Sequence, residues 1–166
     1  MRVDVTLLAD GQYPDAVAEL LRDLPEWFGT EQSVLDYVEA ARTLPTIAAV
    51  REGEVVGICL VRRHTAMTAE IELLAVRRDL HRSGVGRLII ERVEADARAN
   101  GVKLLEVKTF GPSGVSPEYE RTRAFYEAIG FLALEERTDI WGPENPCLIS
   151  VKPLAVEGTY GTINGR

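Results

Sequence analysis

A short glycine turn, His81-Arg82-Ser83-Gly84-Val85-Gly86, follows the apolar segment Glu70–Val76 and precedes a long amphipathic segment. In the order strand, glycine turn and helix start, several backbone N–H groups are left without partners beside the positive end of the helix dipole. Glycine also lets the backbone approach a bulky anion. The sequence therefore predicts a phosphate or pyrophosphate site, with the backbone of Ser83–Arg87 as donor and the guanidinium groups of Arg82 and Arg87 adding charge.

Two common phosphate loops do not fit this segment. The Walker A loop requires Lys-Ser/Thr after its second glycine, whereas Arg87-Leu88 follows Gly86. The dinucleotide fingerprint requires a third small residue three places after the second glycine, and that place holds Ile89. Both loops also usually follow the first strand, and this one lies mid-chain. What remains is the sequence His-Arg-Ser-Gly-Val-Gly between a strand and a helix.

A second motif occurs at Thr122–Phe131, which reads TRAFYEAIGF: a helix carrying Phe-Tyr, then Gly-Phe at the entry to a strand. In this order and at this separation, the two motifs resemble the signatures of the GCN5-related N-acetyltransferase (GNAT) family. The resemblance covers Met1–Leu154. His81 stands where the family usually has Arg or Gln, and Tyr119 stands where many members have an Asn that contacts the cofactor.

The resemblance implies that acetyl-coenzyme A (acetyl-CoA) binds as co-substrate. Its pyrophosphate would lie on the glycine loop, and its peptide-like pantetheine would pair with the open edge of the preceding strand. The residues expected to bind the cofactor are Leu74, Ala75, Val76, His81, Arg82, Ser83, Gly84, Val85, Gly86, Arg87, Tyr119 and Tyr126.

Two carboxylates and one phenol are the candidates for proton transfer. Glu70 and Glu72 lie two residues apart in a strand, so both point to one face unless a bulge separates their directions. Family members use a glutamate on this strand, and we expect Glu70 as the first choice of base and Glu72 as the second, acting through a water. Tyr126 stands at the family's acid position, where a phenol can protonate the departing thiolate. Solvent-facing glutamates and a core aromatic are the structural alternatives.

Loop aromatics are the candidates for the acceptor pocket, because loops often carry binding residues. We expect Trp27, Phe28 and Trp141 to bind substrate, although packing of the two loops explains them equally well. His64 and His81 are too few and too separate to predict a metal site.

The composition indicates one soluble domain. The chain has 166 residues, 46% of them hydrophobic, and a formal net charge of −7. We expect an acetyltransferase domain over residues 1–154 and a mobile tail over 155–166. The acidic balance argues against nucleic-acid or anionic membrane partners, and no apolar run is long enough to span a membrane. The expected location is cytoplasmic, with Cys59 and Cys147 as free buried thiols.

Periodicity predicts a mixed α/β sheet with an early antiparallel part and a later helix crossover. The family resemblance implies a single-domain α/β fold with a GNAT-like mixed, mostly antiparallel sheet flanked by about four helices. In the long helix 84–99, Leu88, Ile89 and Val93 are expected to face the sheet, and Arg87, Glu91, Glu94 and Arg98 to face water. Strands are expected at 3–8, 46–50, 55–61, 69–76, 103–108, 131–138 and 147–152, and helices at 13–24, 33–44, 84–99 and 118–129.

The leading hypothesis is an acetyl-CoA-dependent N-acetyltransferase that acts on a primary amine of a small molecule. Acetylation of a protein or peptide amine, and a non-catalytic acyl-CoA sensor on the same fold, remain open. A toxin that acetylates charged tRNA conflicts with the acidic composition. The family resemblance also suggests a homodimer, formed through the last strands.

Overall fold

The computed structural model describes residues 4–155. One seven-stranded sheet runs through the molecule in the order β1-β2-β3-β4-β5-β7-β6. Its neighbouring strands are antiparallel except β4 and β5, which are parallel. The predicted mixed, mostly antiparallel sheet is therefore confirmed. The strands are β1 (Thr6–Leu8), β2 (Thr46–Arg51), β3 (Glu54–Arg63), β4 (Thr68–Val76), β5 (Leu104–Phe110), β6 (Leu132–Arg137) and β7 (Cys147–Pro153).

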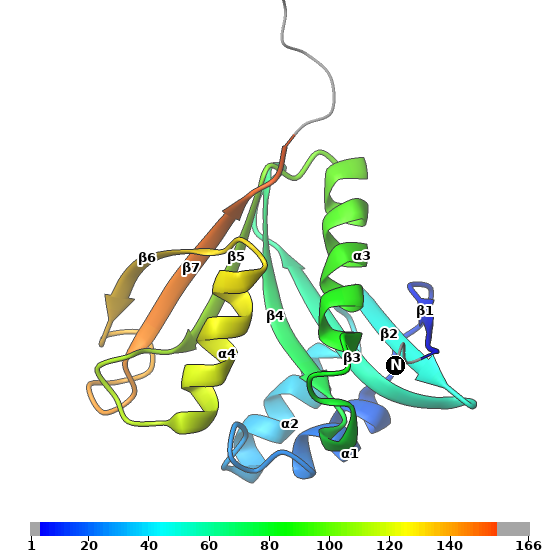
Figure 1. The fold of residues 1–166 in the computed structure, drawn as a ribbon, viewed down its shortest axis with the longest axis horizontal. Coiled ribbons are helices and arrows are strands. Elements are labelled where there is room, and N and C mark those ends of the chain that lie inside the picture. The colour runs from blue at the N-terminus through cyan, green and yellow to red at the C-terminus, as the bar shows by residue number, and fades with distance from the viewer. Residues whose placement is uncertain (1–3, 156–166) are drawn as a thin grey trace, which may run out of the picture.

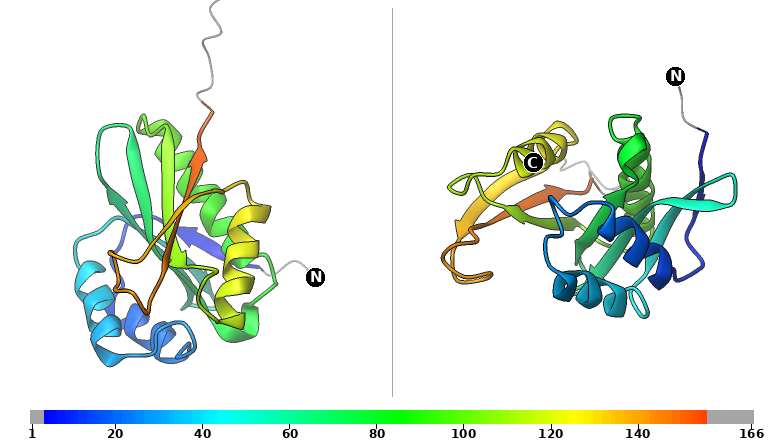
Figure 2. Two further views of the ribbon diagram at one scale, coloured as in Figure 1. Left: turned by 90° about the vertical axis from the view of Figure 1, so that its left-hand side faces the viewer. Right: turned by 90° about the horizontal axis from the view of Figure 1, so that it is seen from below.

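Four α-helices cover the two faces of the sheet (Figures 1 and 2). They are α1 (Pro14–Arg22), α2 (Glu31–Ala40), α3 (Val85–Ala99) and α4 (Pro117–Ala128), and a short 3-10 turn, η1 (Arg78–Leu80), precedes α3. One buried cluster joins the sheet to α3 and α4, and a second joins it to α1 and α2. The two clusters place a helix pair on each face.

The helix starts follow local sequence signals. The Thr30 side chain accepts a hydrogen bond from the Ser33 backbone N–H and caps α2. The Ser116 side chain caps α4 in the same way, and Pro117 occupies the first helical position. Both devices satisfy or remove N–H groups that a helix start leaves unpaired. They fix the residues at which these two helices begin.

The parallel strands β4 and β5 stay together over only part of their length. Thr68–Ile71 pairs with Leu104–Val107, and beyond these residues the two strands separate. Figure 1 shows them meeting at one end of the molecule and diverging towards the other. The edge of β4 that faces β5 therefore carries backbone groups without a strand partner from Glu72 to Val76.

A bulge lies in β4 at the point where this opening begins. Leu60 of β3 pairs with Leu73, whereas the next residue, Val61, pairs with Ile71, so Glu72 is the extra residue. A bulge bends a strand and re-aims the side chain that it carries. The sequence did not decide whether a bulge separates the two glutamates, and the structure has one at Glu72, the second candidate base.

The inner face of α3 differs from the prediction at its C-terminal half. Ile89 and Val93 are buried as expected, but Glu94, expected to face water, is only 7% exposed. Its carboxylate accepts a hydrogen bond of 2.6 Å from Lys152 Nζ on β7 and lies 3.4 Å from Arg98. The ion pair with a distant strand supplies the charge that a buried carboxylate requires.

The remaining expectations concern cysteines, membranes and the chain end. Cys59 and Cys147 are free and buried, as predicted. Among residues 4–155, no helix has the length and apolar character needed to cross a membrane. The predicted tail, 155–166, lies outside the described residues except for its first residue.

Candidate active site

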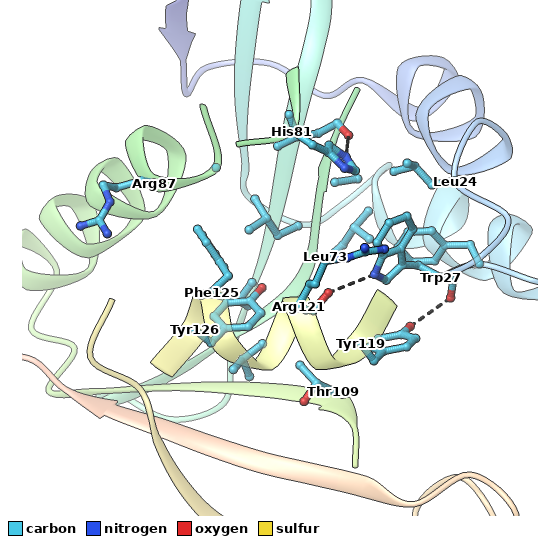
Figure 3. Close-up of a pocket in the computed structure, with 18 of the residues that line it drawn as sticks. Leu24, Trp27, Leu73, His81, Arg87, Thr109, Tyr119, Arg121, Phe125 and Tyr126 are labelled. Carbon is cyan, nitrogen blue, oxygen red and sulfur yellow. Dashed lines mark hydrogen bonds between the residues drawn. The ribbon is translucent and has the colours of Figure 1, made fainter. Parts of the chain in front are cut away.

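A cavity of about 810 Å³ lies in the opening between β4 and β5. Its walls come from the α1–α2 loop, α2, β4, the turn before α3, β5 and α4 (Figure 3). Segments separated widely in sequence therefore meet here, and both sequence motifs contribute to the lining. A concave site with apolar walls and a few convergent polar groups is the usual form of a small-molecule site.

The glycine turn forms one end of this cavity. Arg82 and Gly84 both have positive φ, +62° and +92°, and α3 begins at Val85. A Cβ added to Gly84 would meet no atom within 4 Å, so glycine is favoured there by its backbone conformation and the space around it is open. The first α-helical hydrogen bond runs from Leu88 N–H to the Gly84 carbonyl. The N–H groups of residues 85–87 therefore have no partner within the helix, and they make the start of α3 electropositive.

Side chains of the turn divide between the cavity and the turn itself. His81, Arg82 and Arg87 line the cavity. The His81 ring lies 2.7 Å from the Val76 carbonyl through Nε2 and edge-on to Trp27, with ring centroids 5.6 Å apart. The Ser83 hydroxyl donates back to the Leu80 carbonyl and stabilises the turn. The imidazole thus fixes the end of β4, while the two arginines remain at the mouth.

The two candidate bases have different surroundings. Glu70 is 7% exposed, hydrogen-bonds His64 at 2.6 Å and accepts a bond of 2.9 Å from Lys108 Nζ; it is not among the described residues that line the cavity. Glu72 lines the cavity, and Arg62 donates to both of its oxygens, at 3.0 and 3.2 Å. The hydrogen bond to Glu72 raises the pKa of Arg62. The bulge thus brings Glu72, the second choice, to the cavity wall.

The cluster around Glu70 has metal-ligand chemistry, because ligand atoms of His64, Glu70 and Glu106 lie within 4.8 Å of one another. Lys108 forms ion pairs with both carboxylates of this cluster: its Nζ lies 2.9 Å from Glu70 and 2.8 Å from Glu106. Burial lowers the pKa of Lys108, but its bonds to Glu106 and Glu70 outweigh this effect and raise the pKa overall. The ammonium group therefore supplies positive charge to both carboxylates of this cluster.

Tyrosines on α4 form the opposite wall. Tyr119, Thr122 and Tyr126 line the cavity from one face of the helix. Tyr126 is buried, packs edge-on against Phe125 and Phe131, and projects towards the opening (Figure 3). Burial raises the pKa of Tyr126 far above its ordinary value, so its phenol stays protonated at neutral pH. The Tyr119 hydroxyl donates 3.0 Å to the Trp27 carbonyl, so this hydroxyl holds the α1–α2 loop.

The aromatic residues expected around the acceptor divide into two groups. Trp27 and Phe28 line the cavity, whereas Trp141 does not and is 43% exposed. Trp27 Nε1 donates to the Thr122 hydroxyl at 3.0 Å, which fixes the indole against α4. The structure therefore brings together only the two aromatics of the α1–α2 loop.

Several lining residues escaped the sequence analysis. They include Tyr37, Arg78, Lys108, Thr109 and Arg121. Tyr37 lies on α2, and Arg121 directly precedes the second motif. Thr109 is 4% exposed and its hydroxyl has no partner among the described residues. The only sequence signal at Lys108 and Thr109 is the alternation of side chains along β5, which predicts that these neighbouring residues point to opposite faces of the sheet.

Comparison with known proteins agrees with this architecture. The family model "Acetyltransferase (GNAT) family" matches residues 13–131. An IAA acetyltransferase of Azospirillum brasilense is 30% identical over 91% of this chain and 99% of its own length. An uncharacterized N-acetyltransferase of Chlorobaculum tepidum is 30% identical over 64% of this chain, and the match spans 60% of that relative.

Solved structures share the fold at lower sequence identity. A GNAT family protein of Desulfovibrio desulfuricans superposes with a TM-score of 0.80 at 21% identity, over 92% of this chain and all of that one. A GNAT family acetyltransferase of Elizabethkingia anophelis with acetyl-CoA bound gives a TM-score of 0.67 at 16% identity, over 90% of this chain and 98% of that one.

The chain therefore belongs to the GNAT family of acetyltransferases, as its two motifs predicted. Dependence on acetyl-CoA is general to this family.

Proposed function

We propose that this protein transfers the acetyl group of acetyl-CoA to a primary amine of a small molecule. The observation that carries the proposal is the single cavity between β4 and β5, which extends from the glycine turn to Glu72 and Tyr126. Both substrates would meet in this opening, the cofactor beside the glycine turn and the acceptor beside the α1–α2 loop.

The cofactor end fits the chemistry of coenzyme A. The N–H groups at the start of α3 suit the pyrophosphate, and Gly84 lets it approach. The phosphates would neutralise Arg82 and Arg87, which form no ion pair with the described residues. The β4 edge over Leu74–Val76 has no strand partner among residues 4–155 and, apart from the Val76 carbonyl that His81 contacts, offers backbone partners to the amide groups of pantetheine, as in strand addition. His81, Ser83 and Tyr119 would support the site chiefly by holding its walls.

The reaction would be a direct transfer. The neutral amine nitrogen forms a bond to the acetyl carbonyl carbon, and the bond from that carbon to sulfur breaks. The nitrogen loses a proton and the sulfur leaves with the electron pair of the broken bond. The protein must therefore receive one proton and supply another.

We assign these two proton transfers to Glu72 and Tyr126. Glu72 is supported as base because it lines the cavity and Arg62 fixes its carboxylate. It would take the proton of the amine through a water. Tyr126 is supported as acid because its phenol lines the cavity and stays protonated, so it can donate a hydrogen bond to the departing thiolate. Glu70, already bonded to Lys108, would help to position that lysine at the wall.

The test is a free-thiol release assay with acetyl-CoA and a panel of primary amines. Glu72→Gln should lower kcat by about 100-fold or more, the usual contribution of a general base. Glu70→Gln is the matched control on the same strand and should lower kcat much less. The reverse order would refute the assignment of the base.

The same assay separates the other readings of the site. Thiol release with peptide N-termini but with no small amine would replace the acceptor by a protein. Acetyl-CoA binding without release in any mixture would favour a sensor over an enzyme.

A further inference from the structure

The charge of the cavity differs from that of the whole chain. The protein has a net charge of −7, yet Glu72 is the single carboxylate among the described residues that line the cavity. Five basic side chains share this lining: Arg78, Arg82, Arg87, Lys108 and Arg121. The negative charge of the protein therefore lies mostly elsewhere.

The charged groups on the acceptor side are already paired. Arg62 holds both oxygens of Glu72, and Arg78 Nη2 lies 2.8 Å from Glu26. Lys108 is bound between two carboxylates that lie outside the lining. The acceptor end thus offers one carboxylate, and that carboxylate has a cation beside it.

This arrangement disfavours an acceptor with several positive charges. Each extra ammonium group would leave water and require a carboxylate of its own, because a buried charge without a partner is costly. Arg121, a lining arginine that forms no ion pair with the described residues and is not assigned to the phosphates, would repel it further. A molecule with one amine, neutral when it reacts, makes no such demand.

The same end of the cavity presents flat apolar surfaces. Leu24, Trp27, Phe28, Tyr37 and Leu73 line it. The Phe28 and Tyr37 rings meet edge to face with centroids 5.7 Å apart. Burial, with a smaller contribution from the nearby carboxylates of Glu72 and Glu70, raises the pKa of Tyr37, so its ring is uncharged at neutral pH. Aromatic walls of this kind bind planar apolar groups.

Trp27 is held as a fixed wall on this side. Its indole donates to Thr122 at 3.0 Å, and its carbonyl accepts from the Tyr119 hydroxyl at 3.0 Å. Figure 3 shows both bonds crossing from the α1–α2 loop to α4. Because both anchors lie on α4, the indole is in place before an acceptor arrives, and preorganised walls favour affinity and selectivity.

We infer that the acceptor is a monoamine with a flat aromatic or apolar body, and that Trp27 is a residue that determines this specificity. The inference rests on the proposed acetyl transfer, in which the amine nitrogen replaces sulfur on the acetyl carbon. The body of the acceptor lies against Trp27 and Phe28, and its amine points to Glu72.

The experiment compares kcat/KM in thiol release for 2-phenylethylamine and tryptamine with that for spermidine and kanamycin A. We expect the aromatic monoamines to exceed both polyamines by at least about tenfold, the effect of one well-packed aromatic contact. Faster turnover of spermidine or kanamycin A would overturn the inference and leave the proposed acetyl transfer standing. Absence of release with every amine would defeat the proposed function and this inference together.

Three variants test the role of Trp27. Trp27→Ala should lower kcat/KM for 2-phenylethylamine about tenfold or more, mainly through KM, while Trp27→Phe retains most of it by keeping a flat ring. Trp141→Ala is the matched control, because that tryptophan lies outside the cavity. Acetyl-CoA titration and thermal unfolding identify any variant that has lost its fold. An equal loss in Trp141→Ala, or no loss in either Trp27 variant, would contradict the role of Trp27.

Discussion

Replacing Tyr126 by phenylalanine removes one oxygen atom from the site and leaves its packing intact. The ring contacts Phe125 and Phe131 at centroid distances of 5.2 and 5.3 Å, and phenylalanine keeps both contacts. The free energy of unfolding should therefore change by no more than about 1 kcal/mol. The variant loses its proton donor, which usually contributes about 100- to 10,000-fold in rate, or about 3–5 kcal/mol of activation free energy.

The assay is thiol release at saturating acetyl-CoA over a range of pH, with cofactor affinity measured separately by calorimetry. Tyr119→Phe is the control: it removes a hydroxyl from the same helix face, but one that binds the Trp27 carbonyl. We expect a large fall in kcat for Tyr126→Phe, little change in its acetyl-CoA affinity, and a smaller fall in kcat for Tyr119→Phe. Unchanged kcat in Tyr126→Phe at every pH would refute the acid role and leave Tyr126 as a packing residue.

Three further outcomes follow from the structure. Gly84→Glu should weaken acetyl-CoA binding in calorimetry about 30-fold or more, because it places negative charge beside the phosphates. Gly53→Glu is the control, since Gly53 lies in a hairpin turn with similar φ and open space, and its affinity should not change. Equal affinities of the two variants would show that the loop at Gly84 does not bind the phosphates. Lys152→Met leaves the buried Glu94 carboxylate without its partner at 2.6 Å and should lower the free energy of unfolding, measured in urea, by about 1–3 kcal/mol. Adding Glu94→Gln to the same chain should recover part of this stability, because it removes the unpaired charge. Burial raises the pKa of Tyr119 from 10.0 to about 12, so the contribution of this residue to the free energy of unfolding should be constant below pH 10 and fall by up to about 3 kcal/mol as the pH rises to 12. Burial also raises the pKa of Tyr37 and Tyr126, so both proteins lose stability in this range, and Tyr119→Phe should lose less. An equal loss in the two proteins, or a loss confined to lower pH, would contradict this assignment.

The order of elements could be predicted because local signals mark it. The apolar segment before Gly84 and the amphipathic one after it predict strand, turn and helix, and the left-handed conformation at Gly84 is one that glycine adopts readily. Gly130, which also has positive φ, directly follows the C-cap of α4, a position where glycine commonly ends a helix. The family and the two motif-bearing parts of the cavity follow from these local patterns.

The finer chemistry depends on contacts that no local pattern contains. Whether Glu70 or Glu72 reaches the cavity depends on a bulge, which arises from the pairing of β3 with β4. Glu94 appears solvent-facing by helical period, but its partner Lys152 lies 58 residues away. Trp27 and Trp141 look alike as loop aromatics, and a hydrogen bond to a residue 95 positions away distinguishes the first. Tertiary contacts override the local expectation in each case.

Calorimetric titration of the protein with acetyl-CoA tests the central claim most directly, because both the proposed chemistry and the acceptor inference need the cofactor in the opening between β4 and β5. The account predicts saturable one-to-one binding with a Kd on the order of micromolar. Absence of binding heat and of any thermal stabilisation by acetyl-CoA would contradict it.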